Sequence, residues 1–253
     1  MTEAVLFIHS TGTSPMMWAG VPDEAIGRRD ILVPANLGYP PHPVVERDRT
    51  ITIDDEVEHV LSHVPPSVER LHVVAHSYGA TVALSALPRL REKLASLFLD
   101  EPVLFGALEG DREIDPAIRA EHRALAEGPL FDEANAGGDA WLEAFIDYWN
   151  RPGSWARLPD VMKAHSRAMG WKMFQEVRLC FAARTPFDDY ALDVPTTLVM
   201  GERTTVHSRA VTQALARRRS NVVLVEMPKT GHMAPLTHPS VVHAEIASHF
   251  ARL

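Results

Sequence analysis

The sequence predicts an α/β protein with a mostly parallel sheet of about six strands, helices on both faces and an inserted helical cap. Short continuous apolar runs alternate with longer segments of helical periodicity, as in buried parallel strands joined by crossover helices. This alternation stops after Pro102 and returns at Thr196, and the block between them carries only helical patterns. We therefore expect a core formed by residues 1–102 and 194–253, with residues 103–193 as a cap.

The order of the elements follows from local signals. A helix begins after Thr52, because Asp55 completes a capping box, and it ends at Pro65-Pro66. The expected strands are 4–8, 30–34, 70–75, 95–99, 196–200 and 222–226. The expected helices are 52–64, 79–94, 115–126, 140–149, 208–218 and 241–252.

The composition is that of an ordinary globular protein: 253 residues, of which 46% are hydrophobic and 23% charged. The 33 acidic residues outnumber the 25 basic ones, and the formal charge is −8. Because nucleic acids and anionic membranes attract basic surfaces, we expect neither as a partner. A single cysteine, Cys180, excludes an intrachain disulfide.

The apolar runs are all short. The first, residues 4–8, is much shorter than the core of a signal peptide, and no run approaches the length of a membrane span. We therefore expect a cytoplasmic protein without a membrane span, as a monomer or homodimer.

The strongest chemical signal is the segment 73–80, Val-Val-Ala-His-Ser-Tyr-Gly-Ala, at an expected strand-to-helix junction. A serine on so tight a turn needs small residues two positions before and after it, and Ala75 and Gly79 meet that need. The turn would expose the Ser77 hydroxyl and leave the Tyr78 N–H free for an oxyanion. The alternative is a chance small-x-Ser-x-Gly match, which the flanking strand and helix disfavour.

A nucleophilic serine needs a general base. His232 follows the last expected strand in a glycine-flanked loop, so it can reach a site at the carboxyl ends of the strands. The chain has 13 histidines, most of which we expect to be structural or on the surface, and only its position singles out His232. The nearest competitor is His238, which adjoins Pro239 at the start of the last helix.

The base needs an acidic partner that orients its ring. Asp100 and Glu101 end a buried strand, whereas Thr204 stands where an aspartate would often follow the strand 196–200. At least one of the two acids has an ordinary role as a helix cap or surface ion pair. Glu202 is a third candidate, so the residues alone leave the acid open.

Together these motifs resemble the serine hydrolases of the α/β-hydrolase superfamily, and the resemblance covers nearly the whole chain. The segment His9-Ser10-Thr11-Gly12-Thr13-Ser14, closed by Trp18, is similar to the family's His-Gly oxyanion loop, with Ser10 replacing the usual glycine. The resemblance implies that the backbone N–H groups of Thr11 and Tyr78 form the oxyanion hole.

The segment 96–103 resembles family members whose triad acid follows the strand after the elbow helix. This likeness favours Glu101 over Asp100 and Glu202, and implies a triad of Ser77, Glu101 and His232. Family members that act as dehalogenases or epoxide hydrolases attack through an aspartate at the position of Ser77, so those activities are disfavoured.

The function implied by this resemblance is hydrolysis of a carboxylic ester of a small or medium apolar substrate through an acyl-enzyme. A thioesterase or a carbon–carbon bond hydrolase would use the same residues. Further alternatives are a non-hydrolytic lyase and a binding protein on the same scaffold. No metal cluster, phosphate-binding loop or nucleotide motif is evident, so we expect a small-molecule acyl substrate, no cofactor and no metal.

Aromatic residues are concentrated in the expected cap. Residues 103–193 hold four of the five tryptophans and six of the nine phenylalanines. We expect most of them to form the cap's own core and a few to line an apolar pocket. The candidate pocket residues are Trp18, Phe145, Trp149 and Trp155.

Overall fold

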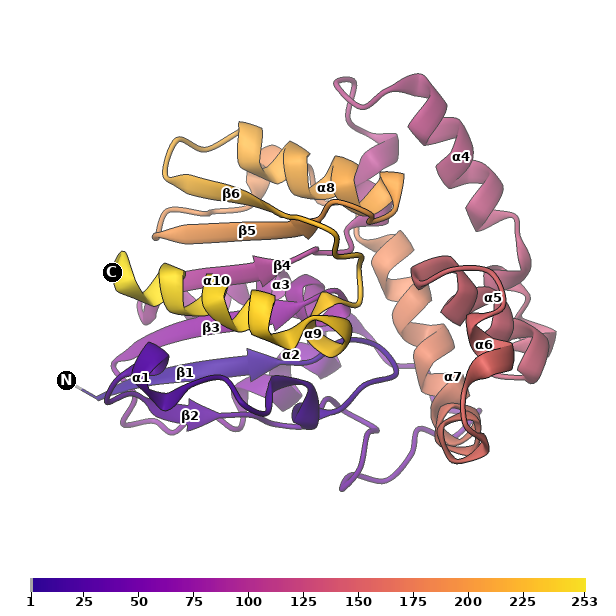
Figure 1. Cartoon of the computed structure of the whole chain (residues 1–253), viewed down its shortest axis with the longest axis horizontal. Helices are drawn as coiled ribbons and strands as arrows, with labels where there is room; N and C mark the ends of the chain where they lie inside the picture. The colour runs from indigo at the N-terminus through magenta and orange to yellow at the C-terminus, as the bar shows by residue number, and fades with distance from the viewer. Residues whose placement is uncertain (1) are drawn as a thin grey trace.

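The computed structural model describes residues 2–253 and contains one six-stranded sheet in the order β2-β1-β3-β4-β5-β6 (Figure 1). All neighbouring strands are parallel. The predicted fold class is confirmed, and each of the expected strands is present. The strands are β1 (Glu3–Ile8), β2 (Asp30–Leu32), β3 (Arg70–His76), β4 (Leu94–Asp100), β5 (Thr196–Gly201) and β6 (Val222–Met227).

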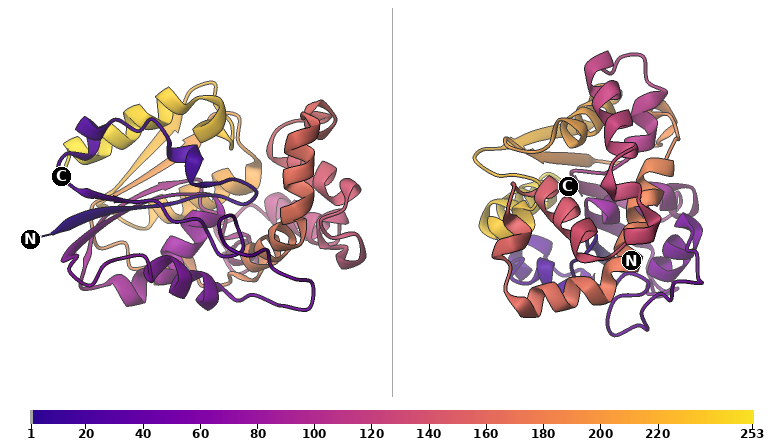
Figure 2. Two further views of the ribbon diagram at one scale, coloured as in Figure 1. Left: turned by 90° about the horizontal axis from the view of Figure 1, so that it is seen from below. Right: turned by 90° about the vertical axis from the view of Figure 1, so that its right-hand side faces the viewer.

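Helices cover both faces of the sheet because alternate strand residues point to opposite sides. Leu6 of β1 belongs to an apolar cluster with α2, α3 and α8, whereas Phe7 belongs to a second cluster with α1 and α10. The first view of Figure 2 shows α10 on one side of the sheet and α2 and α3 on the other. These core helices are η1 (Pro15–Trp18), α1 (Asp23–Ile26), α2 (Ile53–Leu61), α3 (Tyr78–Leu90), α8 (Val206–Arg217), α9 (Ala234–Thr237) and α10 (Pro239–Ala251).

The start of α2 follows its sequence signal. The Thr52 hydroxyl accepts a hydrogen bond from the Asp55 N–H, and the Asp55 carboxylate accepts one from the Thr52 N–H. The helix after the nucleophile is shorter than expected: α3 ends at Leu90, and a turn precedes β4.

Residues 103–193, all of them described, contain helices and no strand, and they lie across the carboxyl ends of the strands (Figure 1). Their side chains form a separate apolar cluster that includes Trp141, Phe145 and Phe174. The helices are η2 (Phe105–Glu109), α4 (Pro116–Ala126), η3 (Pro129–Phe131), η4 (Glu133–Asn135), α5 (Asp139–Trp149), α6 (Ser154–Arg157), α7 (Asp160–Ala182) and η5 (Phe187–Asp189).

The longest helix, α7, has no counterpart among the expected elements. Its buried residues include Lys172, Gln175 and Glu176 as well as apolar side chains. Polar residues at buried positions weaken the apolar periodicity from which a helix is predicted. Within residues 2–253, no helix is both long enough and apolar enough to cross a membrane.

The chain changes direction across the sheet at β1. From β1 it passes to β2 on one side, and β3 and the later strands follow on the other side. In open parallel sheets, ligands bind in the crevice outside the carboxyl ends of the strands at such a switch point. The residues that leave β1 and β3 at this edge are His9 and Ser77.

Candidate active site

The turn between β3 and α3 holds Ser77 in an unusual backbone conformation, with φ 56° and ψ −120°. Non-glycine residues rarely adopt such dihedrals, and they persist only where the surroundings enforce them. The Ser77 N–H donates to the Asp100 carbonyl oxygen at 2.9 Å. A Cβ atom on Gly79 would lie 2.5 Å from the Ile8 carbonyl oxygen, so this close approach of α3 to β1 requires glycine.

The structure brings Ser77, His232 and Glu101 into one chain of hydrogen bonds. The Ser77 Oγ lies 2.9 Å from His232 Nε2, and His232 Nδ1 lies 2.6 Å from Glu101 Oε2. All three residues are buried. The short contact to a carboxylate places the ring proton on Nδ1, which leaves Nε2 free to accept the serine proton.

Three hydrogen bonds besides the one to His232 fix the position of Glu101. It follows β4 with a positive φ of 47°, and its N–H donates to the Val199 carbonyl oxygen at 3.1 Å. Its Oε1 accepts the Gly201 N–H at 2.8 Å, and its Oε2 accepts the Thr204 hydroxyl. Thr204, which stands where an aspartate would often follow β5, therefore supports the carboxylate of Glu101, a role not anticipated from the sequence.

The two other candidate acids do not contact His232. Asp100 is buried, and among residues 2–253 neither of its carboxyl oxygens has a hydrogen-bond partner. Burial raises the pKa of Asp100 well above its usual value, and the charge of Glu101 raises it further. Glu202 is exposed, and its carboxylate accepts the Lys229 N–H at 2.6 Å. These contacts leave Glu101 as the carboxylate paired with the histidine.

Two further rings position His232. The His76 Nε2–H donates to the His232 carbonyl oxygen at 2.9 Å. Burial holds the pKa of His76 well below its usual value, and the neighbouring His232 ring lowers it further, so His76 is neutral and donates this bond. On the other side Trp149, at the end of α5, stacks on the His232 ring with centroids 3.8 Å apart and an interplanar angle of 23°. Neither contact was anticipated in detail, although Trp149 was expected at the pocket.

The loop after β1 is fixed by the segment that follows β2. The Asn36 N–H donates to His9 Nε2 at 2.9 Å, and the Asn36 side chain donates to the His9 carbonyl oxygen at 3.0 Å. Burial lowers the pKa of His9 to about 4, so the ring is neutral and accepts this bond. The Gly12 N–H donates to the Tyr39 hydroxyl at 2.8 Å. Thr11, which precedes Gly12, lines the same cavity as Ser77.

The backbone N–H groups of Thr11 and Tyr78 are available for a ligand. Both residues line the cavity at Ser77, and among residues 2–253 neither N–H donates to a protein acceptor. Tyr78 is the first residue of α3, so its N–H is one of the unsatisfied donors at a helix N-terminus. Such donors stabilise negative charge on an oxygen placed between them.

A buried ionic cluster lies next to Tyr39, which contacts the loop after β1. It is formed by Lys172 and Glu176 of α7 and Glu56 of α2. The Lys172 ammonium contacts both carboxylates, and all three side chains are almost fully excluded from solvent. The Tyr39 hydroxyl donates to Glu176 at 2.9 Å, which connects the cluster to Gly12.

Burial and the neighbouring charges shift the pKa values of two members of this cluster. Burial by itself lowers the pKa of Lys172, but Glu176 and Glu56 outweigh it and hold that pKa above its usual value. Burial raises the pKa of Glu176 despite the neighbouring ammonium, and Glu56 raises it further. The cluster thus links α7, α2 and the loop after β1 through polar contacts that the sequence analysis did not identify.

A cavity of about 200 Å³ opens above Ser77. Its walls are largely apolar and come from both the sheet loops and residues 103–193. Phe145 and Trp149, two of the candidate pocket residues, line it. The other lining residues include Val103, Phe105, Leu130, Ile146, Met173, Val177, Phe181, Met233 and Leu236.

The two other candidate pocket residues, Trp18 and Trp155, lie outside the lining of this cavity. Trp18, the last residue of η1, packs against Phe7 on the sheet face covered by α10, with ring centroids 5.6 Å apart. Trp155 is buried in the apolar cluster of the cap helices. Proximity in sequence to the oxyanion loop or to a Pro-Gly break did not determine which way either ring points.

A family model described as the alpha/beta hydrolase family matches residues 5–245. The chain therefore belongs to the alpha/beta hydrolase family. Among curated protein sequences, none matches this chain.

Solved structures share the fold at low sequence identity. A thermophilic esterase from Thermogutta terrifontis is 20% identical, with 100% of this chain and 90% of the other covered and a TM-score of 0.68. MGS-M2, an alpha/beta hydrolase from a Medee basin deep-sea metagenome, is 16% identical, covers 100% and 90%, and has a TM-score of 0.72. A meta-cleavage product hydrolase from Pseudomonas fluorescens IP01 is 12% identical, covers 100% and 91%, and has a TM-score of 0.66.

Proposed function

We propose that this protein is a serine hydrolase that cleaves a carboxylic ester of a small or medium apolar substrate through an acyl-enzyme. One observation carries the proposal: Ser77, His232 and Glu101 form a buried hydrogen-bonded chain, with successive distances of 2.9 and 2.6 Å, at the base of an apolar cavity. This is the arrangement that activates a serine nucleophile, and it is recognised by geometry rather than by sequence position.

In the proposed reaction the Ser77 Oγ attacks the ester carbonyl carbon, and His232 Nε2 takes the hydroxyl proton. The Glu101 carboxylate stabilises the imidazolium that forms and keeps its ring oriented. Collapse of the tetrahedral intermediate breaks the bond to the alcohol oxygen, which receives the proton from His232. Water then attacks the acyl-enzyme with His232 again as the base, and releases the acid and free Ser77.

The oxyanion of each tetrahedral intermediate would be bound by the N–H groups of Thr11 and Tyr78. Their availability and their position at the cavity support this assignment. Donors fixed before the reaction stabilise developing charge without reorganisation. The bonds from Asn36 to His9 and from Gly12 to Tyr39 would supply that rigidity.

We assign residues 103–193 as a cap that forms the roof of the substrate pocket. Phe145 and Trp149 would contact the apolar part of the substrate. An apolar pocket binds acyl or aryl groups by burying their surface, and a volume of about 200 Å³ suits a small to medium group.

The direct test is covalent labelling with a fluorophosphonate, followed by measurement of the intact mass. Wild-type protein should gain one adduct, and Ser77→Ala should gain none and lose about 10⁶-fold in kcat on an activated ester. Absence of labelling in folded wild-type protein would reject the acyl-enzyme and favour a lyase or a binding protein on this scaffold.

The same residues would also serve a thioesterase or a carbon–carbon bond hydrolase. The structural likeness to a meta-cleavage product hydrolase is the reason to test carbon–carbon bond hydrolysis as well. A panel of esters and thioesters of increasing acyl length, together with a vinylogous diketone substrate, separates the three by kcat/KM. An ester hydrolase should show its highest kcat/KM on one of the esters.

A further inference from the structure

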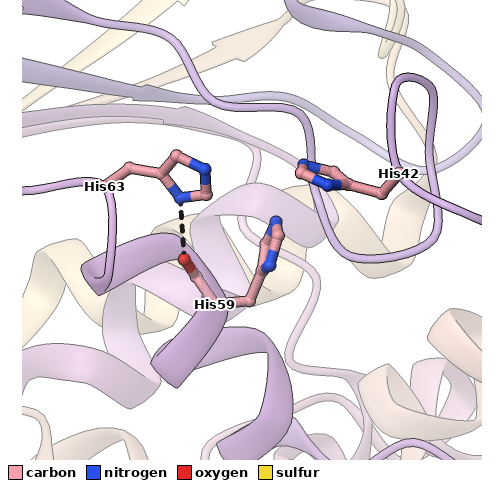
Figure 3. Close-up of side chains that lie close together, drawn as sticks. All are labelled: His42, His59 and His63. Atoms are coloured by element: carbon pink, nitrogen blue, oxygen red, sulfur yellow. Dashed lines mark hydrogen bonds between the residues drawn. The ribbon is translucent and has the colours of Figure 1, made fainter.

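Three histidines lie together away from the cavity at Ser77, as Figure 3 shows. His42 belongs to the long loop that follows β2, whereas His59 is in the last turn of α2 and His63 follows that helix. Each offers one ring nitrogen, and these nitrogens lie within 4.8 Å of one another. The rings of His59 and His63 lie side by side, with centroids 5.0 Å apart.

Hydrogen bonds to backbone carbonyl oxygens orient two of these rings. His59 Nε2 lies 2.9 Å from the Ala35 oxygen, and His63 Nδ1 lies 2.8 Å from the His59 oxygen (Figure 3). The bond of His63 places its proton on Nδ1 and leaves Nε2 unprotonated. An imidazole that donates one N–H to a carbonyl while its other nitrogen faces an ion is the usual arrangement of a metal-binding histidine.

The donor set selects a class of ion. Three imidazole nitrogens suit Zn²⁺ and neighbouring first-row divalent ions, whereas Ca²⁺ and Mg²⁺ require oxygen ligands. The nitrogens of a tetrahedral zinc site lie about 3.4 Å apart for Zn–N bonds of about 2.1 Å. The nitrogens must therefore approach one another by at most about 1.4 Å, and the exposure of His63 allows this movement.

We propose that His42, His59 and His63 form a binding site for Zn²⁺ or a similar divalent transition-metal ion, with solvent as the fourth ligand. His63 is exposed and the other two are half-buried, so water can reach the ion. No metal was expected from the sequence, in which no metal-binding cluster is evident; His42 is brought to His59 and His63 only by the fold. This proposal does not depend on the proposed esterase activity.

Metal binding here would tie the loop after β2 to α2. The same loop carries Ala35, which contacts His59, and it continues into Asn36 and Tyr39, which hold the oxyanion loop. A metal ion would therefore restrain the segment on which the geometry of His9 and Gly12 depends. The rings of His42 and His59 already pack edge to face, with centroids 4.6 Å apart.

The test uses untagged full-length protein, stripped with a chelator and equilibrated with Zn²⁺ during dialysis. Wild-type protein should bind one ion per chain, and Co²⁺ substitution should give the visible absorption of a tetrahedral site. Removal of one ligand, by His42→Gln or His63→Gln, should weaken Zn²⁺ binding by more than about tenfold, because even the loss of a group that only orients a ligand costs about that much. At a hundredfold excess over Kd, Zn²⁺ should raise the wild-type Tm by about 5 °C or more.

The matched control is His165→Gln, which changes an exposed histidine on α7 outside the cluster. It should bind Zn²⁺ as wild-type does. Melting without metal verifies that each variant is folded, and His63→Gln, at an exposed position, keeps the test valid if His42→Gln is unstable. Equal Zn²⁺ affinity in wild-type protein and the His42→Gln/His63→Gln double variant, or no binding by wild-type protein, would overturn the proposal.

Discussion

The sheet loops and the helices of residues 103–193 meet at one cavity but hold their side chains by different interactions. On the loop side, Glu101 accepts hydrogen bonds from His232, Gly201 and Thr204, and Ser77 is fixed by a strained turn. On the helix side, Trp149 lies on His232 through ring stacking at 3.8 Å.

This difference separates the residues that arrange the reacting atoms from those that shape the wall of the cavity. Hydrogen bonds depend strongly on distance and angle, so the loop side fixes a particular arrangement of reacting atoms. Apolar packing tolerates changes that conserve volume, so the helix side can vary while the arrangement below it remains. The cluster of Lys172, Glu56 and Glu176 joins the core to residues 103–193 by charge, and so do the ion pairs of Arg218 with Asp111 and Asp188. Substitutions on the loop side should therefore reduce turnover most, and substitutions on the helix side should act on substrate binding.

The largest effect after loss of the nucleophile should come from Glu101→Gln, with kcat reduced by about 10⁴-fold. The glutamine amide can present an N–H to His232 Nδ1, and the ring would then lose the tautomer that accepts the serine proton. Turnover of an activated ester measures the loss. Asp100→Asn and Glu202→Gln are the matched controls and should retain turnover within a fewfold. Near-normal turnover of Glu101→Gln would show that another group orients His232.

Lys172→Met should lower the free energy of unfolding by about 3–5 kcal/mol, because it leaves two buried carboxylates without their cation. Urea denaturation measures the change. The control is Arg167→Met on the same helix, where the ion pair with Asp139 is exposed and should contribute less than about 1 kcal/mol. Equal losses in the two variants would mean that the cluster does not join the two sides as described.

Thr204→Val should reduce kcat by about 10–100-fold, the equivalent of one hydrogen bond to a charged group. Valine has nearly the shape of threonine, so the change removes the hydroxyl that donates to Glu101 and keeps the volume of the side chain. Thr204→Ser restores a hydroxyl and should recover most of the rate. A valine variant with wild-type kcat would mean that Gly201 alone suffices to hold the carboxylate.

The smallest effect should come from Trp149→Leu, with kcat/KM reduced by about 2–10-fold, which corresponds to the loss of one aromatic pair. Trp149→Phe should preserve a stacked ring and most of the activity. Trp155→Phe tests the contrast within the same block, because Trp155 is buried outside the cavity and its replacement should leave KM unchanged. A larger loss from Trp155→Phe than from Trp149→Leu would contradict the placement of these rings.

Local signals made much of the fold predictable. The capping box at Thr52, the apolar runs of the strands and the glycine two residues after Ser77 each depend on neighbours in sequence. Such features appear in the structure close to where they were expected. By contrast, α7 was missed because its buried face carries Lys172 and Glu176, which pair with each other and with the distant residues Glu56 and Tyr39.

The residues of the site also divide into those that could be identified from the sequence and those that could not. The turn around Ser77 and the position of His232 after the last strand could be identified from the chain alone, since each follows from the order of elements. The choice among Asp100, Glu101 and Glu202 could be argued only by resemblance. It depends on which side chain turns toward His232, and a positive φ at Glu101 and the donors Gly201 and Thr204 decide this.

By itself, the sequence determined the α/β class, the strand order along the chain, and the residue types that meet at the carboxyl edge of the sheet. It could do so because hydrophobic periodicity and turn chemistry are local properties. Only the tertiary structure decided which rings face the cavity, how Lys172 is paired, and that His42 meets His59 and His63. These outcomes depend on contacts between distant segments, whose directions are fixed when the segments pack together.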